Sequence, residues 1–232
     1  MLTKFIKKCN ELDVELSEKQ LELLDILYNR LVSENEKFNL TTITEKENVY
    51  FLHFLDSLAG VPYIPENANV IDVGSGGGFP AIPIKIARDD ITLTMVDSVT
   101  KKVNYLNDTV SSLSLENAHA IHTRIEDLAR TEKRESYDVV TARAVAKLNT
   151  LAEYCLPLIN INGLFIAYKS YSDEEIKEAE NAIKILGGKI EKIVSVDVLP
   201  DHTRTLILIR KIESTPKKYP RGKNKERTSP IV

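Results

Sequence analysis

Apolar residues recur along this chain with two different periods. In the first part of the chain they fall every three or four positions, which is the spacing of an amphipathic helix. The pattern predicts helices over residues 3–12 and 17–37, and a third helix that begins near Thr44. Ser17 and Gln20 have the spacing of a capping box at the start of the second helix. No strand pattern interrupts this part, so we expect its helices to pack as a cap on the domain that follows.

From residue 69 onward, short apolar runs alternate with helical patterns. We expect strands at 69–73, 91–97, 118–122, 137–141, 162–168, 190–198 and 203–211. We expect helices between them at 80–88, 99–112, 125–130, 147–157 and 172–186. Strands that alternate with helices predict a parallel α/β sheet covered on both faces. The last two strands are connected only by Leu199-Pro200-Asp201-His202, which is too short for a crossover helix, so we expect an antiparallel hairpin there.

The pattern divides the chain into a helical cap at residues 1–62, a sheet domain at 63–212 and a tail at 213–232. A length of 232 residues with 43% hydrophobic content suits one main domain with a single core. Cys9 and Cys155 stand apart without metal-ligand spacing, which is typical of a reducing compartment. The first residues lack a signal-peptide pattern, and no apolar run approaches the roughly 20 residues of a membrane span. We therefore expect a cytoplasmic protein without a membrane partner.

The first strand leads directly into a glycine-rich turn, Val70-Ile71-Asp72-Val73-Gly74-Ser75-Gly76-Gly77-Gly78-Phe79-Pro80. Glycine removes the Cβ atom that would block a close ligand. The order of strand, glycine turn and helix therefore predicts a site for an adenosine-bearing cofactor, the alternative being a tight turn without a ligand.

Two cofactor classes fit this turn. The spacing Asp72-x-Gly74-x-Gly76-x-Gly78 is that of S-adenosylmethionine-dependent methyltransferases, while Gly76-x-Gly78-x-x-Ala81 fits the dinucleotide pattern. The glycines alone leave both open. Five βα units followed by a closing hairpin are typical of the Rossmann-like class I methyltransferase fold, a mostly parallel seven-stranded sheet, whereas a dinucleotide fold usually continues with parallel crossovers.

Ligands in such sheets lie beyond the carboxyl ends of the strands, so polar residues at these ends are candidates. Asp97 ends the second strand, and its two acceptor oxygens suit the two ribose hydroxyls of a cofactor; the alternative is a cap for the next helix. Arg124-Ile125-Glu126-Asp127 follows the third strand and can present backbone N–H groups and a carboxylate to an adenine edge. The alternative there is the acidic first turn of a helix.

The fourth strand ends in Thr141-Ala142-Arg143-Ala144-Val145-Ala146, the position that faces the methyl group in class I folds. It holds neither the Asn/Asp-Pro-Pro-aromatic set that binds an exocyclic amine nor a cysteine nucleophile. A ring nitrogen with a free lone pair needs neither, so we expect no catalytic residue beyond those that align the substrates. Arg143 is expected to orient the methionine end of the cofactor or the base, or else to pair with Asp97 or Glu126.

The histidines carry weaker signals. His53 and Asp56 share a helix face three residues apart, and we interpret the pair as a structural contact rather than a catalytic dyad. His119 and His122 lie three apart on a predicted strand and therefore on opposite faces. We expect no metal site.

The end of the chain is basic although the whole chain carries a net charge of −3. Residues 210–232 hold eight Lys and Arg against two Glu. This asymmetry indicates either a site where a polyanion docks or a solvated tail. Basic residues interleaved with an aromatic ring suit RNA, through phosphate contacts and base stacking. The candidate RNA-binding residues are Lys217, Lys218, Tyr219 and Arg221.

Five blocks spread over nearly the whole chain match one family. They are Asn39-Leu40-Thr41-Thr42-Ile43, His53-x-x-Asp56-Ser57-Leu58, the glycine turn from Asp72 to Pro80, Arg143-Ala144-Val145-Ala146, and Tyr219-Pro220-Arg221. By these blocks the chain resembles the bacterial small-subunit (16S) rRNA guanine-N7 methyltransferases, also called glucose-inhibited division protein B. The resemblance implies a class I fold, S-adenosylmethionine as cofactor, and methylation of one guanine N7 in 16S rRNA. By motif position, its cofactor contacts fall on Gly74, Phe79, Ile125, Glu126 and Arg143.

The chain departs from the family in two places: Gly222-Lys223-Asn224-Lys225 replaces the usual Gly-x-Pro, and Glu126 takes the place of a small residue. The residue arguments add Gly76 and Asp97 to the expected cofactor site. The expected partner is 16S rRNA or an assembly intermediate of the small subunit, bound by a monomer. Two alternatives stay open. One is an NAD-dependent oxidoreductase, which the hairpin and Phe79 disfavour, and the other is a catalytically silent RNA-binding protein that keeps the fold as a scaffold.

Overall fold

The structure is a computed structural model that describes residues 1–143, 145–170, 173–199 and 202–232. Four residues of predicted features therefore fall outside the described residues. These are Ala144 in the block after the fourth strand, Ser172 at the start of a helix, and Pro200 and Asp201 in the hairpin connection.

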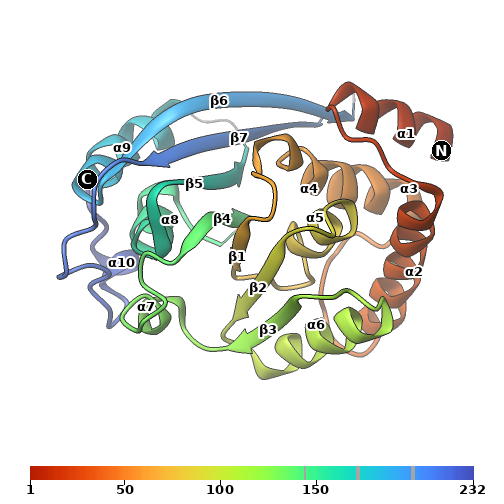
Figure 1. The fold of residues 1–232 in the computed structure, drawn as a ribbon, viewed down its shortest axis with the longest axis horizontal. Coiled ribbons are helices and arrows are strands. Elements are labelled where there is room, and N and C mark those ends of the chain that lie inside the picture. The colour runs from red at the N-terminus through yellow and green to blue at the C-terminus, as the bar shows by residue number, and fades with distance from the viewer. Residues whose placement is uncertain (144, 171–172, 200–201) are drawn as a thin grey trace.

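Within the described residues, seven strands form one sheet in the order β3-β2-β1-β4-β5-β7-β6 (Figure 1). They are β1 (Asn69–Val73), β2 (Thr92–Asp97), β3 (Ala118–His122), β4 (Tyr137–Arg143), β5 (Ile159–Lys169), β6 (Gly188–Leu199) and β7 (His202–Lys211). The first five strands run parallel to their neighbours, and β7 runs antiparallel to both β5 and β6. The predicted fold class and its closing hairpin are confirmed.

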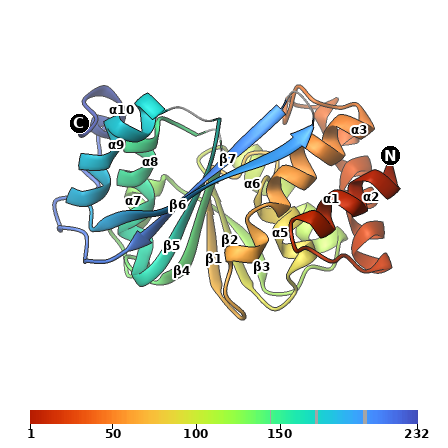
Figure 2. The ribbon, with the colours of Figure 1, turned by 90° about the horizontal axis from the view of Figure 1, so that it is seen from above.

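Helices cover both faces of the sheet (Figure 2). On one face lie α1 (Leu2–Glu11), α2 (Glu18–Asn35), α3 (Lys46–Val49), α4 (Asp56–Leu58), α5 (Ala81–Ala87) and α6 (Thr100–Ser112). On the other lie α7 (Ile125–Leu128), α8 (Leu148–Cys155), α9 (Asp173–Ile185) and α10 (Lys225–Thr228). Two short 3-10 helices, η2 (Val61–Tyr63) and η3 (Leu156–Leu158), precede β1 and β5. Each face has its own buried apolar cluster, because a sheet with two covered faces needs a core on both. No helix among the described residues has the length and apolar character needed to cross a bilayer.

The predicted cap helices begin and end close to their expected bounds. The capping box at Ser17 and Gln20 is present, with Gln20 N–H donating to Ser17 Oγ at 3.3 Å. The third helix departs from the expectation, because α3 continues into a π-helical stretch, η1 (Tyr50–Leu55), before α4. Such stretches often occur at functional sites. This one carries His53, and α4 begins with Asp56, so the irregular helix holds the two polar side chains that face the sheet edge.

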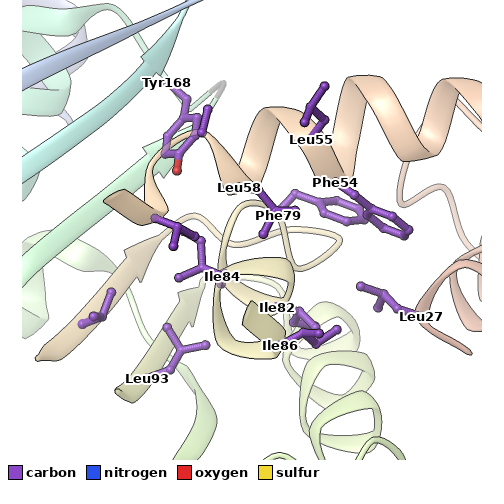
Figure 3. Close-up of a cluster of buried hydrophobic side chains, with 14 of the residues drawn as sticks. Leu27, Phe54, Leu55, Leu58, Phe79, Ile82, Ile84, Ile86, Leu93 and Tyr168 are labelled. Carbon is purple, nitrogen blue, oxygen red and sulfur yellow. The ribbon is translucent and has the colours of Figure 1, made fainter. Parts of the chain in front are cut away.

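The glycine turn packs against an apolar cluster formed with the cap helices (Figure 3). Phe79 extends from the turn toward Phe54, and the two ring centroids are 6.0 Å apart. Ile82, the second residue of α5, and Leu58 are fully buried in the same cluster. The turn is therefore fixed to the cap helices through the Phe79 side chain.

The last residues return along the second face of the molecule, beside α7 and α8 (Figure 1). We call residues 215–232 the C-terminal strap. Its last carbonyl, that of Val232, accepts a hydrogen bond from Asn181 of α9 at 2.7 Å. Tyr219, Pro220 and Glu226 of the strap are buried, so the strap is attached to the domain, whereas the sequence left a solvated tail as one alternative.

Candidate active site

A cavity of about 260 Å³ opens at the carboxyl ends of β1 and β2. It is lined by Val73, Gly74, Val96, Asp97, Ser98, Thr123, Arg124, Ile125, Glu126, Val145, Tyr154, Asn224 and Arg227. Four of the seven predicted cofactor residues are therefore brought together here. The other three are not among the lining residues: Gly76 and Phe79 lie further along the glycine turn, and Arg143 ends β4.

The glycine turn is held in place by the neighbouring strand. The N–H groups of Gly74 and Ser75 both donate to the carbonyl of Val96 on β2, at 2.8 and 3.0 Å. Gly76 has a φ of +55°, a region that other residues resist. A Cβ atom added to Gly76 meets nothing closer than the Gly74 carbonyl at 3.8 Å, so the space above it is open. The turn is thus a preformed cradle with room for a ligand.

Asp97 closes one side of the cavity and supports the turn. Its Oδ2 accepts the Gly76 N–H at 3.0 Å, and its Oδ1 accepts the Val99 N–H at 2.9 Å, just before α6. Asp97 therefore makes a contact of the kind that the alternative, a cap for the next helix, predicts. Each oxygen keeps a second lone pair and the side chain lines the cavity, so a ribose contact stays a prediction.

Asp72 lies beneath the turn and is 1% exposed. Its Oδ1 accepts a hydrogen bond from Thr141 Oγ1 at 2.6 Å, while its Oδ2 has no hydrogen-bond partner among the described residues. Burial raises the pKa of Asp72 to about 6. A buried carboxylate without a full set of partners favours a nearby cation. S-adenosylmethionine carries positive charge on its sulfur and its amino group, so the residues present fit this cofactor.

The segment after β3 forms the far wall of the cavity. Ile125 and Glu126 begin α7, and the Glu126 carboxylate pairs with Arg124 at 3.1 Å. The acidic first turn that the sequence left as an alternative is therefore present. The first N–H groups of a helix have no partner within it. Contacts from this turn to an adenine edge stay a prediction.

Arg143 forms its ion pair with Asp56, so the partners named in the alternative for this residue, Asp97 and Glu126, are wrong. The Arg143 NH1 donates to Asp56 Oδ2 at 2.7 Å, and Asp56 is fully buried. Asp56 lies 87 positions away in the chain, which is why no local pattern indicates the contact.

Arg204 of β7 is the second cation beside Asp56. Its Nε lies 2.9 Å from Asp56 Oδ1. Arg204 is not among the predicted site residues, although its place at the start of β7 indicates it. Because β7 is antiparallel, its first residues lie at the same sheet edge as the carboxyl ends of β4 and β5.

His53 joins Arg143 to the glycine turn. Its ring stacks on Phe79 with centroids 4.6 Å apart, and its Nδ1 lies 3.2 Å from Arg143 NH2. Since Arg143 can only donate, Nδ1 is the acceptor and Nε2 carries the proton toward Thr41 Oγ1, 2.8 Å away. His53 and Asp56 are thus connected through Arg143. The Arg143 guanidinium also lies over the Phe79 ring, 5.2 Å from its centroid.

The buried His53 and Asp72 predict opposite pH effects on stability. Burial and the charge of Arg143 lower the pKa of His53 to about 3. Below pH 6.5 the unfolded histidine binds a proton that the folded one does not, so stability falls as the pH falls. The pKa of Asp72 is raised to about 6, so between about pH 4 and 6 the folded state binds a proton that the unfolded state does not. This proton binding stabilises the folded state, and the stabilisation is lost as the pH rises from about 4 to 6.

We expect His53→Gln to gain stability relative to the parent as the pH falls from 6.5 to 4.5, by at most about 1.4 kcal/mol per pH unit. Asp72→Asn is expected to lose stability relative to the parent over the lower part of this range, because the favourable proton uptake is removed. Urea denaturation at several pH values measures both. Parallel pH profiles for the parent and both variants would contradict these assignments.

The predicted RNA-binding residues fall into two pairs. Lys217 and Lys218 are exposed. The Tyr219 side chain is 8% exposed and belongs to the second apolar cluster, and Arg221 pairs with the buried Glu153 at 2.8 Å. Contacts of Tyr219 or Arg221 to RNA stay a prediction, and they would require these internal contacts to break.

Comparison with known proteins identifies the family of this chain. Residues 20–205 match the profile of the family described as rRNA small subunit methyltransferase G. The chain belongs to this family. The ribosomal RNA small subunit methyltransferase G of Bacillus subtilis (strain 168) is 44% identical over 235 residues, covering 99% of this chain and 98% of that protein. The Bacillus licheniformis protein of the same name is 48% identical over 223 residues, covering 94% and 93%.

Solved structures support the fold. A SAM-dependent methyltransferase from Aquifex aeolicus superposes with a TM-score of 0.55 at 15% identity, over 78% of this chain and 98% of that one. A SAM-dependent O-methyltransferase from Thermotoga maritima gives 0.52 at 14% identity, over 80% and 72%. The resemblance seen in the sequence is confirmed, and with it S-adenosylmethionine as the cofactor of this rRNA small subunit methyltransferase G family member. The NAD-dependent alternative is wrong.

Proposed function

We propose that this protein transfers the methyl group of S-adenosylmethionine to N7 of one guanine in 16S rRNA of the small ribosomal subunit. The observation that carries the proposal is the cavity beside the glycine turn, where Gly74, Asp97, Ile125 and Glu126 meet. Family membership supplies the substrate class.

The chain's own residues provide position and electrostatics. When bound, S-adenosylmethionine supplies an electrophilic methyl group on a sulfonium, and the N7 lone pair of guanine accepts it without loss of a proton. Asp97 lines the cavity and is proposed to accept from the ribose. The buried Asp72 carboxylate is proposed to favour the positive charge of the cofactor. Three acceptors take N–H groups of Arg143 within the described residues: the Leu52 carbonyl, Asp56 and His53. The guanidinium has five donors, so two remain for guanine O6, the acceptor adjacent to N7.

The substrate is proposed to be 16S rRNA, either free or in an assembly intermediate of the small subunit. Lys217 and Lys218 are exposed and suit phosphate contacts. We propose that the protein acts as a cytoplasmic monomer.

The test uses 16S rRNA and small subunits prepared from cells that lack this protein. Purified protein and methyl-labelled S-adenosylmethionine are expected to place label in 7-methylguanosine, identified by mass spectrometry after nuclease digestion. Arg143→Met serves as the impaired control. Label in another nucleoside would contradict the position, and cofactor binding without any transfer would favour the silent RNA-binding alternative.

A further inference from the structure

Two sets of hydrogen bonds hold the C-terminal strap near α7 and α8, in addition to the bond from Asn181 to Val232. The first lies after α7, where Arg134 donates to the carbonyls of Thr215 and Tyr219, at 2.7 and 2.9 Å, and Arg130 donates to that of Pro220 at 2.7 Å. These are charge-assisted hydrogen bonds to backbone carbonyls, which are stronger than neutral ones. They fix the course of the strap independently of its side chains.

The second set is on α8. The Glu153 carboxylate, 1% exposed, accepts the Arg221 side chain at 2.9 and 2.8 Å and also the Arg221 backbone N–H at 2.8 Å. One turn earlier, Thr150 Oγ1 donates to the Glu226 carbonyl at 2.8 Å. A buried carboxylate that loses its partner is costly, so this pair keeps the strap on the helix.

These hydrogen bonds bring α10 to the cofactor cavity. Asn224 and Arg227 line the cavity, together with Tyr154 of α8. Burial raises the pKa of Tyr154, and the adjacent Arg227 guanidinium partly offsets that rise. Both strap residues lie beyond residue 205, where the match to the family profile ends.

We infer that Arg227, with Asn224, contacts the adenosine half of S-adenosylmethionine, and that Arg221 and Glu153 are positioning residues for it. The inference rests on the proposed cofactor site. The same cavity is lined by the residues expected at the ribose and at the adenine, Asp97 and Ile125. A planar guanidinium stacks on a purine ring and donates to its ring nitrogens. The strap is therefore part of the cofactor site, in contrast to a tail that serves only RNA.

The test is calorimetric titration of the full chain with S-adenosylhomocysteine. Arg227 is exposed in this structure, and Arg227→Ala is expected to raise Kd by about 5- to 30-fold, which spans the range from an exposed to a desolvated cation–π contact. Lys225→Ala is the matched control, because it removes the same charge from the same short helix but does not line the cavity. It is expected to change Kd by less than about 2-fold. Arg227→Lys is expected to fall between Arg227→Ala and the parent.

A second ligand locates the contact on the cofactor. 5′-Methylthioadenosine lacks the amino-acid half, and Arg227→Ala is expected to weaken its binding by the same factor. Arg221→Ala is expected to weaken both ligands, since it releases the strap. Arg221→Ala also serves as a control for the position of α10, while Lys217→Ala with Lys218→Ala is expected to leave both affinities unchanged.

Equal affinities for Arg227→Ala and Lys225→Ala would overturn the inference. Loss of affinity for S-adenosylhomocysteine alone, with methylthioadenosine unaffected, would overturn the assignment to adenosine. A parent protein that binds neither ligand would instead overturn the proposed cofactor site, so the two failures are distinguishable. Thermal unfolding of each variant verifies that it is folded during the titration.

Discussion

Replacing Asp56 with Ala is expected to lower the free energy of unfolding by about 3–5 kcal/mol, the cost of breaking a buried ion pair from one side. Asp56 is fully buried between Arg143, 11% exposed, and Arg204, 27% exposed. Without the carboxylate, both guanidinium groups stay beside each other with no counter-charge. The substitution also removes one of the three hydrogen bonds that connect Arg143, at the end of β4, to the irregular helix.

The rate of methyl transfer by Asp56→Ala is also expected to fall, by about 100-fold if Arg143 moves by about 1 Å. Asp56→Asn keeps the shape and removes the charge, so it separates the activity loss from the packing loss. The matched control is Glu191→Ala, which breaks the exposed pair with Arg210 on the same strand as Arg204. That change is expected to cost less than about 1 kcal/mol. Equal costs for Asp56→Ala and Glu191→Ala, measured by urea denaturation, would show that the buried charges are not coupled.

Asp97→Ala is expected to raise the Kd for S-adenosylhomocysteine by about 100-fold or more, because hydrogen bonds to a charged group contribute about 1.5–3 kcal/mol each. The substitution removes the acceptor of the Gly76 N–H as well as the expected ribose contact. Calorimetry measures the affinity. An unchanged Kd would contradict the place of Asp97 in the site.

A double-mutant cycle separates the two roles of Asp97. The 2′-deoxy form of S-adenosylhomocysteine lacks one ribose hydroxyl and is expected to bind the parent more weakly. If Asp97 accepts from this hydroxyl, the Asp97→Ala variant no longer distinguishes the two ligands. If the deoxy form is weaker by the same factor in both proteins, the residue acts only by holding the turn.

Local signals in the sequence predict most of the fold. The spacing of apolar residues, of glycines and of short connections predicts the strand at 69–73, the glycine turn and the hairpin. Each of these signals lies within a few neighbouring positions of the chain. The predicted bounds of strands and helices differ from the observed ones by at most three residues. The π-helical stretch η1 could not be predicted, because the spacing of apolar residues in Tyr50–Leu55 does not distinguish a π-helix from an α-helix.

Only part of the candidate site can be predicted from local sequence signals. Gly74, Asp97 and Ile125 each follow a strand, so the rule that ligands lie at strand ends finds them. The contacts of Asp56 with Arg143 and of Glu153 with Arg221 join positions 87 and 68 residues apart. Arg221 illustrates the difficulty, since a basic residue beside Tyr219 suggests RNA but its partner is a carboxylate buried in α8.

The most direct test of the central claim is to map N7 methylation of 16S rRNA in cells, by reduction and strand cleavage at 7-methylguanosine. We predict cleavage at one guanine in cells that contain the protein, loss of that cleavage when the protein is deleted, and its return with the parent but not with Asp97→Ala. An unchanged cleavage pattern in the deletion cells would contradict the account.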